Sequence, residues 1–353
     1  MPSFLKKKQF WGSIIALLLL AFIVKDISPD DLRRLYNRVN PYFLIPCLLA
    51  QFMILFFKGW RWRTIVERSK PMRLTQVVPM FAAGQVINIF MPALTGQVGR
   101  LLLFSRRTGL SKTYIFSTIV LEVLFDAMSL LVFIAVLSAA SFAFPPEYRK
   151  VGLIIAIATI SLLTCLYVYL HFQDAAGILG RKLCRNRWPG FYITVKKFTR
   201  SFTRGITMLR STQYFTKTLL LSLAAWVSQL MVVYSLFNAF GFDLPLVAAM
   251  VLMVVNTLAV MIPITPGNAG TFELAVLATL SLFFGRIGKS DAALFGLALH
   301  IFDILPMFVL GYLFLHIEKI TIREIDVEEV EQERYGIMNQ MDEAEAVKEE
   351  DRA

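Results

Sequence analysis

The sequence predicts an all-α polytopic membrane protein, with six full transmembrane helices and two Pro/Gly-broken re-entrant hairpins arranged as two inverted repeats. The first observation is composition: 57% of the 353 residues are hydrophobic and 17% are charged, against roughly 45–50% and about 25% in soluble domains. The second is that apolar runs near or above the ~18 residues needed to span a bilayer recur along the chain. The third is that Pro and Gly interrupt two of these runs. A soluble enzyme, a secreted domain and a disordered chain are excluded.

Six stretches predict full spans, namely 10–24, 41–57, 113–143, 151–171, 216–240 and 291–316. The first follows three lysines and ends at Lys25 without the small-residue site at which a signal peptide is cleaved, so we interpret it as a retained helix. It is short for a span, but lysines at its ends can extend toward the membrane surface.

Two basic loops predict the orientation of these spans. Residues 58–73 carry six Lys/Arg and one acid, and residues 181–210 carry nine Lys/Arg and no acid. Positively charged loops stay on the cytoplasmic side, so we expect both loops and both termini there. The connections 25–40, 144–150 and 241–245 would lie outside.

The charge also divides the chain into two regions. Residues 1–316 carry 31 Lys/Arg against 12 Asp/Glu, and residues 317–353 carry 5 against 13. We interpret 1–316 as the transmembrane domain and 317–353 as an acidic cytoplasmic tail to which a protein partner could bind. A basic membrane domain indicates contact with anionic lipid and not with nucleic acid.

Two further apolar stretches, 76–104 and 246–285, are each broken by a Pro- and Gly-rich segment. Such breaks free backbone groups that must face protein or water inside a membrane. The two breaks align without gaps when the chain is shifted so that Pro92 falls on Pro263, and we call this alignment the repeat register. The second break also contains Pro266. The matching pairs are Pro92 with Pro263, Gly96 with Gly267, Gln97 with Asn268, and Gly99 with Gly270.

The aligned breaks predict an inverted repeat. If each broken stretch returns to the side it left, the first opens from the cytoplasm and the second, three spans later, opens from outside. The halves 1–143 and 151–316 would then be inverted copies of one another. Paired broken segments in opposite halves indicate a substrate site near the middle of the membrane, so the pattern favours transport.

Five motifs along the chain form a recognisable set, namely Arg61-Trp62-Arg63, the break from Pro92 to Arg100, Arg106 with Gly109 and Ser111, Glu122 with Asp126, and P-x-[ST]-P-G-x-x-G-x-x-E from Pro263 to Glu273. With these motifs, the sequence resembles the lysylphosphatidylglycerol synthase transmembrane region, the flippase-like module of MprF-type proteins, over most of residues 10–316. Two departures concern charge: Gln97 and Val123 stand where the family usually has Glu and Arg.

The resemblance implies translocation of a phospholipid, a glycolipid or a polyprenyl-linked lipid across a bacterial or archaeal cytoplasmic membrane. Membrane lipids with an anionic or modified headgroup would be the binding partners. We expect no lysyl transfer, because the sequence after residue 316 contains only the acidic tail and not the family's aminoacyl-transferase domain.

Acidic side chains inside a predicted span need a partner or a water-lined cavity, because burying a charge in a membrane is costly. Glu122 and Asp126 are spaced i, i+4, which places both carboxylates on one helix face. They could bind a cationic headgroup or cycle a proton. They could equally form ion pairs with Arg100 or with basic residues of 58–73.

The other candidate substrate-binding residues each have a structural alternative. Arg100 could hold a lipid phosphate or anchor the chain at the interface, and Arg61 could attract phosphate or belong to an interfacial aromatic belt. Glu273 could face the substrate or cap a helix N-terminus. Gln97 and Asn268, at the tips of the breaks, could contact ligand or tie the hairpins together.

His300 and Asp303 are spaced i, i+3 and share one face of the last span. They could relay a proton or form a hydrogen bond within the bundle. The three Cys and three His are scattered without the spacing of a disulfide framework or a metal site, and no nucleotide-binding motif is present. We therefore expect no metal and no cofactor.

Three functions remain open. The leading one is a flippase-like lipid transporter. The alternatives are a membrane-embedded transferase acting on a lipid carrier, which no catalytic motif supports, and a scaffold that docks a partner through its acidic tail.

Overall fold

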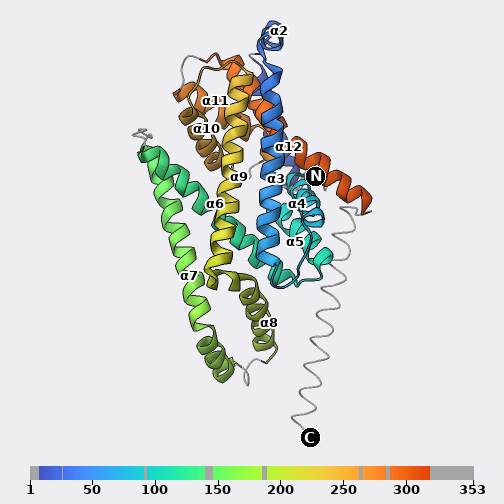
Figure 1. Ribbon diagram of the computed structural model, residues 1–353, viewed down its shortest axis with the longest axis vertical. Helices are drawn as coiled ribbons and strands as arrows, with labels where there is room; N and C mark the ends of the chain where they lie inside the picture. Colours follow the sequence, from blue (N-terminus) through green and yellow to red (C-terminus); the bar gives the residue numbers. More distant parts are fainter. Residues whose placement is uncertain are drawn as a thin grey trace.

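The computed structural model describes residues 8–25, 27–90, 94–139, 146–184, 189–261, 265–283 and 287–318. These ranges contain helices and no strand, which confirms the all-α prediction (Figure 1). The elements are α1 (Lys8–Val24), α2 (Pro29–Arg38), η2 (Pro41–Phe43), α3 (Leu44–Val66), α4 (Leu74–Phe90), α5 (Leu94–Thr108), α6 (Lys112–Ala139), α7 (Pro146–Cys184), α8 (Pro189–Ile206), η3 (Thr207–Arg210), α9 (Thr212–Ala239), α10 (Leu246–Ala259), η4 (Pro266–Asn268), α11 (Thr271–Phe283) and α12 (Lys289–Ile317).

Among the described residues, five helices are long and apolar enough to cross a membrane, in agreement with a polytopic membrane protein. The first predicted span corresponds to α1, which has 17 residues and is not among these five, so the count of six stays a prediction. The five are Pro41–Val66, Lys112–Ala139, Leu153–Phe172, Thr212–Ala239 and Lys289–Ile317.

The order of elements repeats in the register found in the sequence. When the chain is shifted onto itself in the repeat register, α3 falls on α9, α4 on α10, α5 on η4 with α11, and α6 on α12. Each half thus consists of a long helix, a broken pair of short helices and a second long helix. The elements α1, α2, α7 and α8 lie outside this match.

Each broken pair begins and ends at the same end of the bundle. Before α4, Lys70 Nζ donates to the carbonyl oxygen of Thr108, at the end of α5, over 2.5 Å. Arg38 makes the corresponding link for the second pair, since Nη2 donates to the Gly241 oxygen over 2.8 Å and Nη1 lies 3.4 Å from Asp291 at the start of α12. In Figure 1, α4 and α5 lie below α10 and α11. Entry of these pairs into a membrane stays a prediction.

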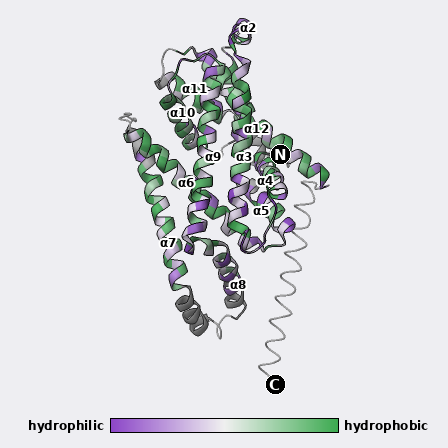
Figure 2. Ribbon diagram, viewed as in Figure 1, coloured by the Kyte–Doolittle hydropathy of each residue, from purple (hydrophilic) through white to green (hydrophobic). Residues whose placement is uncertain are grey.

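The loop after α3 and the start of α9 lie together at the lower end of the bundle in Figure 1. The Arg68 guanidinium lies 4.5 Å from the centre of the Tyr214 ring, and Lys217 Nζ lies 3.9 Å from a Glu67 oxygen. The first basic loop therefore lies beside the start of α9, which directly follows the second basic loop, so the described ends of both loops are at one end of the bundle. Hydrophilic residues gather at this end near α5 and α8 (Figure 2).

The long helices pack closely where small residues allow it. Along α3 and α9, buried aliphatic and aromatic side chains form part of one core cluster. Where α12 passes α4, a Cβ on Gly311 would lie 2.7 Å from the Ala82 carbonyl carbon and oxygen and 2.6 Å from a Val86 methyl carbon. Glycine at this position therefore lets the two backbones approach, as small residues do between transmembrane helices.

We predict that Gly311→Val destabilises the purified protein by about 1–3 kcal/mol, because the side chain would overlap the α4 backbone. The measurement is the thermal unfolding midpoint in detergent. Gly288→Ala is the matched control, since nothing lies within 4 Å of a Cβ placed there. Equal midpoints for both variants would show that α4 and α12 are not in this contact.

We also predict which residues share a membrane side. In a variant without its three cysteines, single cysteines at the exposed positions Arg68 and Ser111 should react with an impermeant maleimide from one side. Cysteines at the exposed positions Asp243 and Lys289 should react from the other. Labelling of positions 68 and 111 from opposite sides would show that the first broken pair crosses the membrane.

Candidate functional site

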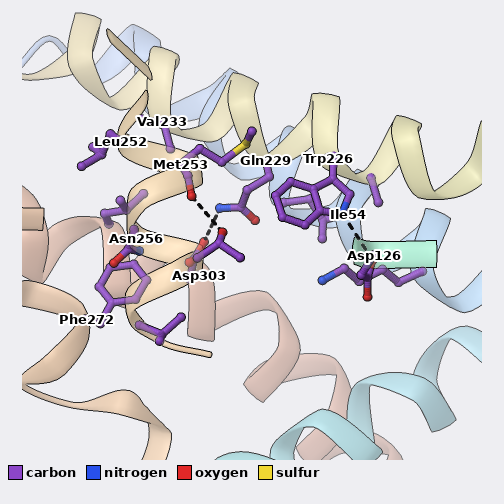
Figure 3. A pocket seen from close by; sticks show the side chains of 15 residues that line it. Ile54, Asp126, Trp226, Gln229, Val233, Leu252, Met253, Asn256, Phe272 and Asp303 are labelled. Atoms are coloured by element: carbon purple, nitrogen blue, oxygen red, sulfur yellow. Dashed lines mark hydrogen bonds between the residues drawn. The ribbon is translucent and has the colours of Figure 1, made fainter. Parts of the chain in front are cut away.

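A cavity of about 270 Å³ lies between α3, α6, α9, α10, α11 and α12, so both halves of the repeat contribute to its walls. Much of the lining is aliphatic, but charged and polar side chains from five of these helices also line it (Figure 3). The lining residues that carry polar or charged groups are Lys58, Asp126, Trp226, Gln229, Asn256, Thr257 and Asp303.

Asp303 is bound by two neutral amides. Its Oδ1 accepts hydrogen bonds from Gln51 Nε2 and, over 3.2 Å, from Gln229 Nε2. Within the described ranges no ion pair to Asp303 is present. Lys58, from α3, lines the same cavity and interacts electrostatically with both Asp303 and Asp126. The cavity wall therefore combines one lysine with two carboxylates, and the hydrogen bonds that Asp303 accepts from described residues come from amides.

Asn256 and Trp226 provide further polar groups in the cavity wall. Asn256 is 8% exposed, and its Oδ1 has no hydrogen-bond partner among the described residues. Trp226 Nε1 donates to Asp126 Oδ1 over 3.3 Å. A buried amide oxygen without a donor is costly unless a bound molecule supplies one, so Asn256 marks a place where a donor-bearing group would fit.

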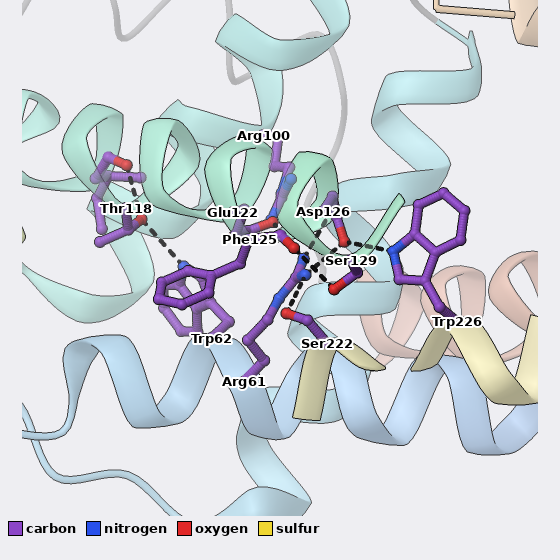
Figure 4. A network of polar contacts seen from close by, with 11 residues as sticks. Arg61, Trp62, Arg100, Thr118, Glu122, Phe125, Asp126, Ser129, Ser222 and Trp226 are labelled. Atoms are coloured by element: carbon purple, nitrogen blue, oxygen red, sulfur yellow. Dashed lines mark hydrogen bonds and ion pairs between the residues drawn. The ribbon is translucent and has the colours of Figure 1, made fainter. Parts of the chain in front are cut away.

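Beside the cavity, Arg61 joins the carboxylates of α6 to α3 and α9 (Figure 4). Its Nη1 and Nη2 lie 2.6 and 3.1 Å from the two oxygens of Asp126, and Nη2 lies 3.8 Å from Glu122. Nη1 also donates to Ser222 Oγ over 2.9 Å. Arg61 is 1% exposed, so this guanidinium is held entirely by protein groups.

Arg100 completes the cluster from α5. Its Nη2 lies 2.6 Å from both oxygens of Glu122, and its guanidinium lies over the rings of Phe81 and Phe104 at 4.7 and 5.1 Å. Two arginines thus face two carboxylates and their formal charges cancel. Removing an ion from water costs several kcal/mol, which explains why these four charges lie together.

The ion pairs bear on four sequence predictions. Glu122 and Asp126 make the contacts of the ion-pair alternative. The interfacial alternatives are wrong for Arg61 and Arg100, which are 1% and 4% exposed, because the α6 carboxylates hold both guanidiniums inside the bundle. Trp62, the aromatic neighbour of Arg61, is also buried, and its Nε1 donates to Thr118 Oγ1. Ligand binding stays a prediction for Asp126, whose side chain is 33% exposed and faces the cavity.

The second break lies against the end of α4, the helix that precedes the first break. At Gly267 and Asn268, φ is 59° and 60°, and a Cβ on Gly267 would lie 3.2 Å from Ile89 at the end of α4. Gly270, with φ 83°, packs against Leu19 of α1, which a Cβ there would approach to 2.5 Å. Glycine is required at 267 and 270 because these turns combine positive φ with close neighbours.

The remaining break residues are placed as follows. Pro266 begins η4, Gly96 lies in α5, and Gly99 is buried in α5. Pro92 and Pro263 lie outside the described residues. The proposed tie between Gln97 and Asn268 is not seen: within the described chain, Gln97 Oε1 and Asn268 Oδ1 are both buried without a hydrogen-bond partner.

Glu273 and His300 meet next to the second break. Glu273 Oε2 accepts from the Gly270 N–H over 2.8 Å, which is the capping contact that the sequence allowed. Its Oε1 lies 2.8 Å from His300 Nδ1, and His300 Nε2 lies 3.0 Å from the Gly267 oxygen. The relay alternative paired His300 with Asp303. In the structure, one ring nitrogen of His300 contacts Gly267 in the second break and the other contacts Glu273. A relay role stays a prediction.

Several residues around the cavity are not identified as site residues by the sequence patterns. Lys58 was assigned to a cytoplasmic loop, whereas it lies within α3 and lines the cavity. Gln51 and Gln229 were overlooked as isolated amides in apolar helices. One signal was available, since Lys58 and Gln229 are equivalent in the repeat register.

Comparison with known proteins identifies similar sequences. The family model described as "Lysylphosphatidylglycerol synthase TM region" matches residues 9–311. A UPF0104 membrane protein of Methanothermobacter thermautotrophicus is 23% identical over 295 residues, covering 79% of this chain and 86% of the relative. Another UPF0104 membrane protein of the same organism is 24% identical over 305 residues, covering 80% and 85%.

We predict that Glu122→Gln destabilises the protein by about 3–5 kcal/mol, because it leaves Arg100 charged and buried without its partner. The thermal unfolding midpoint in detergent measures this loss. Asp30→Asn is the control, since the Asp30 side chain is 81% exposed and its loss should change stability by at most about 0.5 kcal/mol. A midpoint for Glu122→Gln equal to that of the control would contradict the ion pair.

Proposed function

This chain belongs to the lysylphosphatidylglycerol synthase TM region family, and from that premise we propose that it is a flippase-like transporter. It moves a phospholipid, a glycolipid or a polyprenyl-linked lipid across the cytoplasmic membrane, with its basic end in the cytoplasm. The observation that carries the proposal is the charged cavity lined by helices of both halves. The cytoplasmic orientation rests on the two basic loops, whose described ends lie at one end of the bundle.

The size of the cavity favours a headgroup over a whole lipid. Pockets that enclose a drug-sized molecule have volumes of about 300–1,000 Å³, and this cavity has about 270 Å³. The acyl chains would therefore remain in the bilayer while the headgroup occupies the cavity.

The side chains that line the cavity can bind a polar headgroup that has lost its hydrating water. Lys58 can pair with a phosphate or another anion, whereas Asp303 and the unpartnered Asn256 Oδ1 can accept hydrogen bonds from amines or hydroxyls. These contacts would offset the desolvation of a polar headgroup. Asp126 is already neutralised by Arg61 and would be a secondary contact.

The predicted inverted orientation of the two halves would provide a mechanism for alternating access. The walls of the cavity come from α3 and α6 in one half and from α9, α10, α11 and α12 in the other. Rocking of one half against the other would open the cavity first to one side and then to the other, as in transporters built from inverted repeats.

The proposal predicts accelerated lipid exchange in proteoliposomes. Labelled lipids with zwitterionic, anionic, aminoacylated and polyprenyl-linked headgroups are reconstituted with the full chain, and an impermeant quencher reports their exposure. One class should exchange faster than in protein-free vesicles. Asp303→Asn and Lys58→Gln should each slow that exchange by about ten- to a hundredfold, because each removes a hydrogen bond to a charged group worth ~1.5–3 kcal/mol.

Asp30→Asn, on the exposed surface of α2, should exchange the same lipid at the wild-type rate. Equal rates for every lipid, unchanged in the Asp303 and Lys58 variants, would indicate leak and overturn the proposal. No exchange of any class would overturn it as well.

A further inference from the structure

His300 lies between two acceptor groups of the second half. Its Nε2 is 3.0 Å from the carbonyl oxygen of Gly267, in η4, and its Nδ1 is 2.8 Å from Glu273 Oε1, at the start of α11. Glu273 is 3% exposed and His300 is 9% exposed. Phe272 stacks on the imidazole at 4.5 Å and lines the cavity on its other side. The pair is therefore directly behind the cavity wall.

The hydrogen-bond partners determine where the protons lie. A carbonyl oxygen only accepts, so His300 Nε2 must carry a hydrogen. Glu273 Oε2 accepts from the Gly270 N–H, so the contact between Nδ1 and Oε1 needs one additional proton. That proton is on Nδ1, giving an imidazolium and a carboxylate, or on Oε1, giving two neutral groups. Without it, two lone pairs face each other across 2.8 Å.

We propose that Glu273 and His300 form a proton-binding site, and that the proton they hold is the coupling ion of the transport proposed above. This inference rests on the proposed function for its second part only. Binding of the proton fastens α11 and the Gly267 turn to α12. Its release removes the attraction between Nδ1 and Oε1 and frees the second break.

Asp303 provides a route for the proton between the pair and the cavity, and the helices packed around the pair carry few other titratable groups. Asp303 follows one turn later on α12, interacts electrostatically with His300 and lines the cavity. From α3, Cys47 and Lys58 interact electrostatically with Asp303. The helices α4 and α10 contain no titratable residue, nor do residues 14–24 of α1, and α11 contains only Glu273.

The position of the site fits the direction of a proton gradient. The second broken pair begins and ends at the end of the bundle opposite the basic loops, where Arg38 bridges Gly241 and Asp291. With the basic loops in the cytoplasm, that end faces the outer and more acidic side. Protons would enter the pair from outside and leave through the cavity and Asp303 toward the cytoplasm.

The first test measures the protonation state of the His300 ring nitrogens by ¹⁵N NMR of the full chain, labelled at histidine, in nanodiscs. The chain has three histidines, and His300→Gln assigns the signal of interest. We expect Nε2 to stay protonated and the shared proton to be lost in one transition as the pH is raised. In Glu273→Gln, which keeps the shape of the side chain but not its charge, that transition should disappear.

His316→Gln, at the exposed end of α12, is the matched control and should leave the His300 transition unchanged. A His300 signal that does not change with pH overturns the proton site. A transition that is identical in wild type and Glu273→Gln shows that His300 titrates alone, and it overturns the shared site as well.

The second test measures coupling through the labelled-lipid exchange described above, under an imposed pH gradient. Wild type should exchange lipid faster with the acidic side outside than without a gradient, whereas the rate of Glu273→Gln should not depend on the gradient. Wild-type exchange that ignores the gradient overturns the coupling and leaves transport intact. Absence of exchange overturns transport and coupling together, and the NMR titration still decides whether the pair binds a proton.

Discussion

The structure depends on the neutralisation of charges inside an apolar bundle. Two arginines, one from α3 and one from α5, meet two carboxylates one turn apart on α6. Neither member of these pairs could stay buried alone, because an unpaired ion in such surroundings costs several kcal/mol. The cluster therefore fixes the position of the first broken pair against α6 and α3, and it places Asp126 where one face of its carboxylate borders the cavity.

The two halves share a scaffold but differ in chemistry. In the repeat register, Arg61 corresponds to Val232, Glu273 to Leu102, and His300 to Ser129. The first half therefore contains the neutral cluster of permanent charges, and the second contains the pair that needs one additional proton. In the transporter proposed above, one half would keep its contacts and the contacts of the other half would depend on protonation.

Periodicity and composition predicted the helical membrane fold, the breaks and their repeat, because these depend on local hydropathy and on Pro and Gly. The partners of the buried charges could be named only as alternatives, since Arg61 and Asp126 are 65 residues apart and their contact depends on tertiary packing. The contact between Glu273 and His300 was missed for the same reason: spacing on one helix favoured Asp303, whereas α11 supplied the actual partner. Isolated amides such as Gln229 carry no periodic signal.

The links at the outer ends of the broken pairs have a mechanical consequence. Lys70 joins the two ends of the first pair, and Arg38 joins the two ends of the second at the opposite end of the molecule. Each pair is thus held together at one end of the bundle, and Gly267 of the second pair lies against Ile89, near the end of α4 in the first. In the transporter proposed above, a small rotation about either linked end would displace this contact most, so the contact between Gly267 and Ile89 would gate the path between the two sides of the membrane.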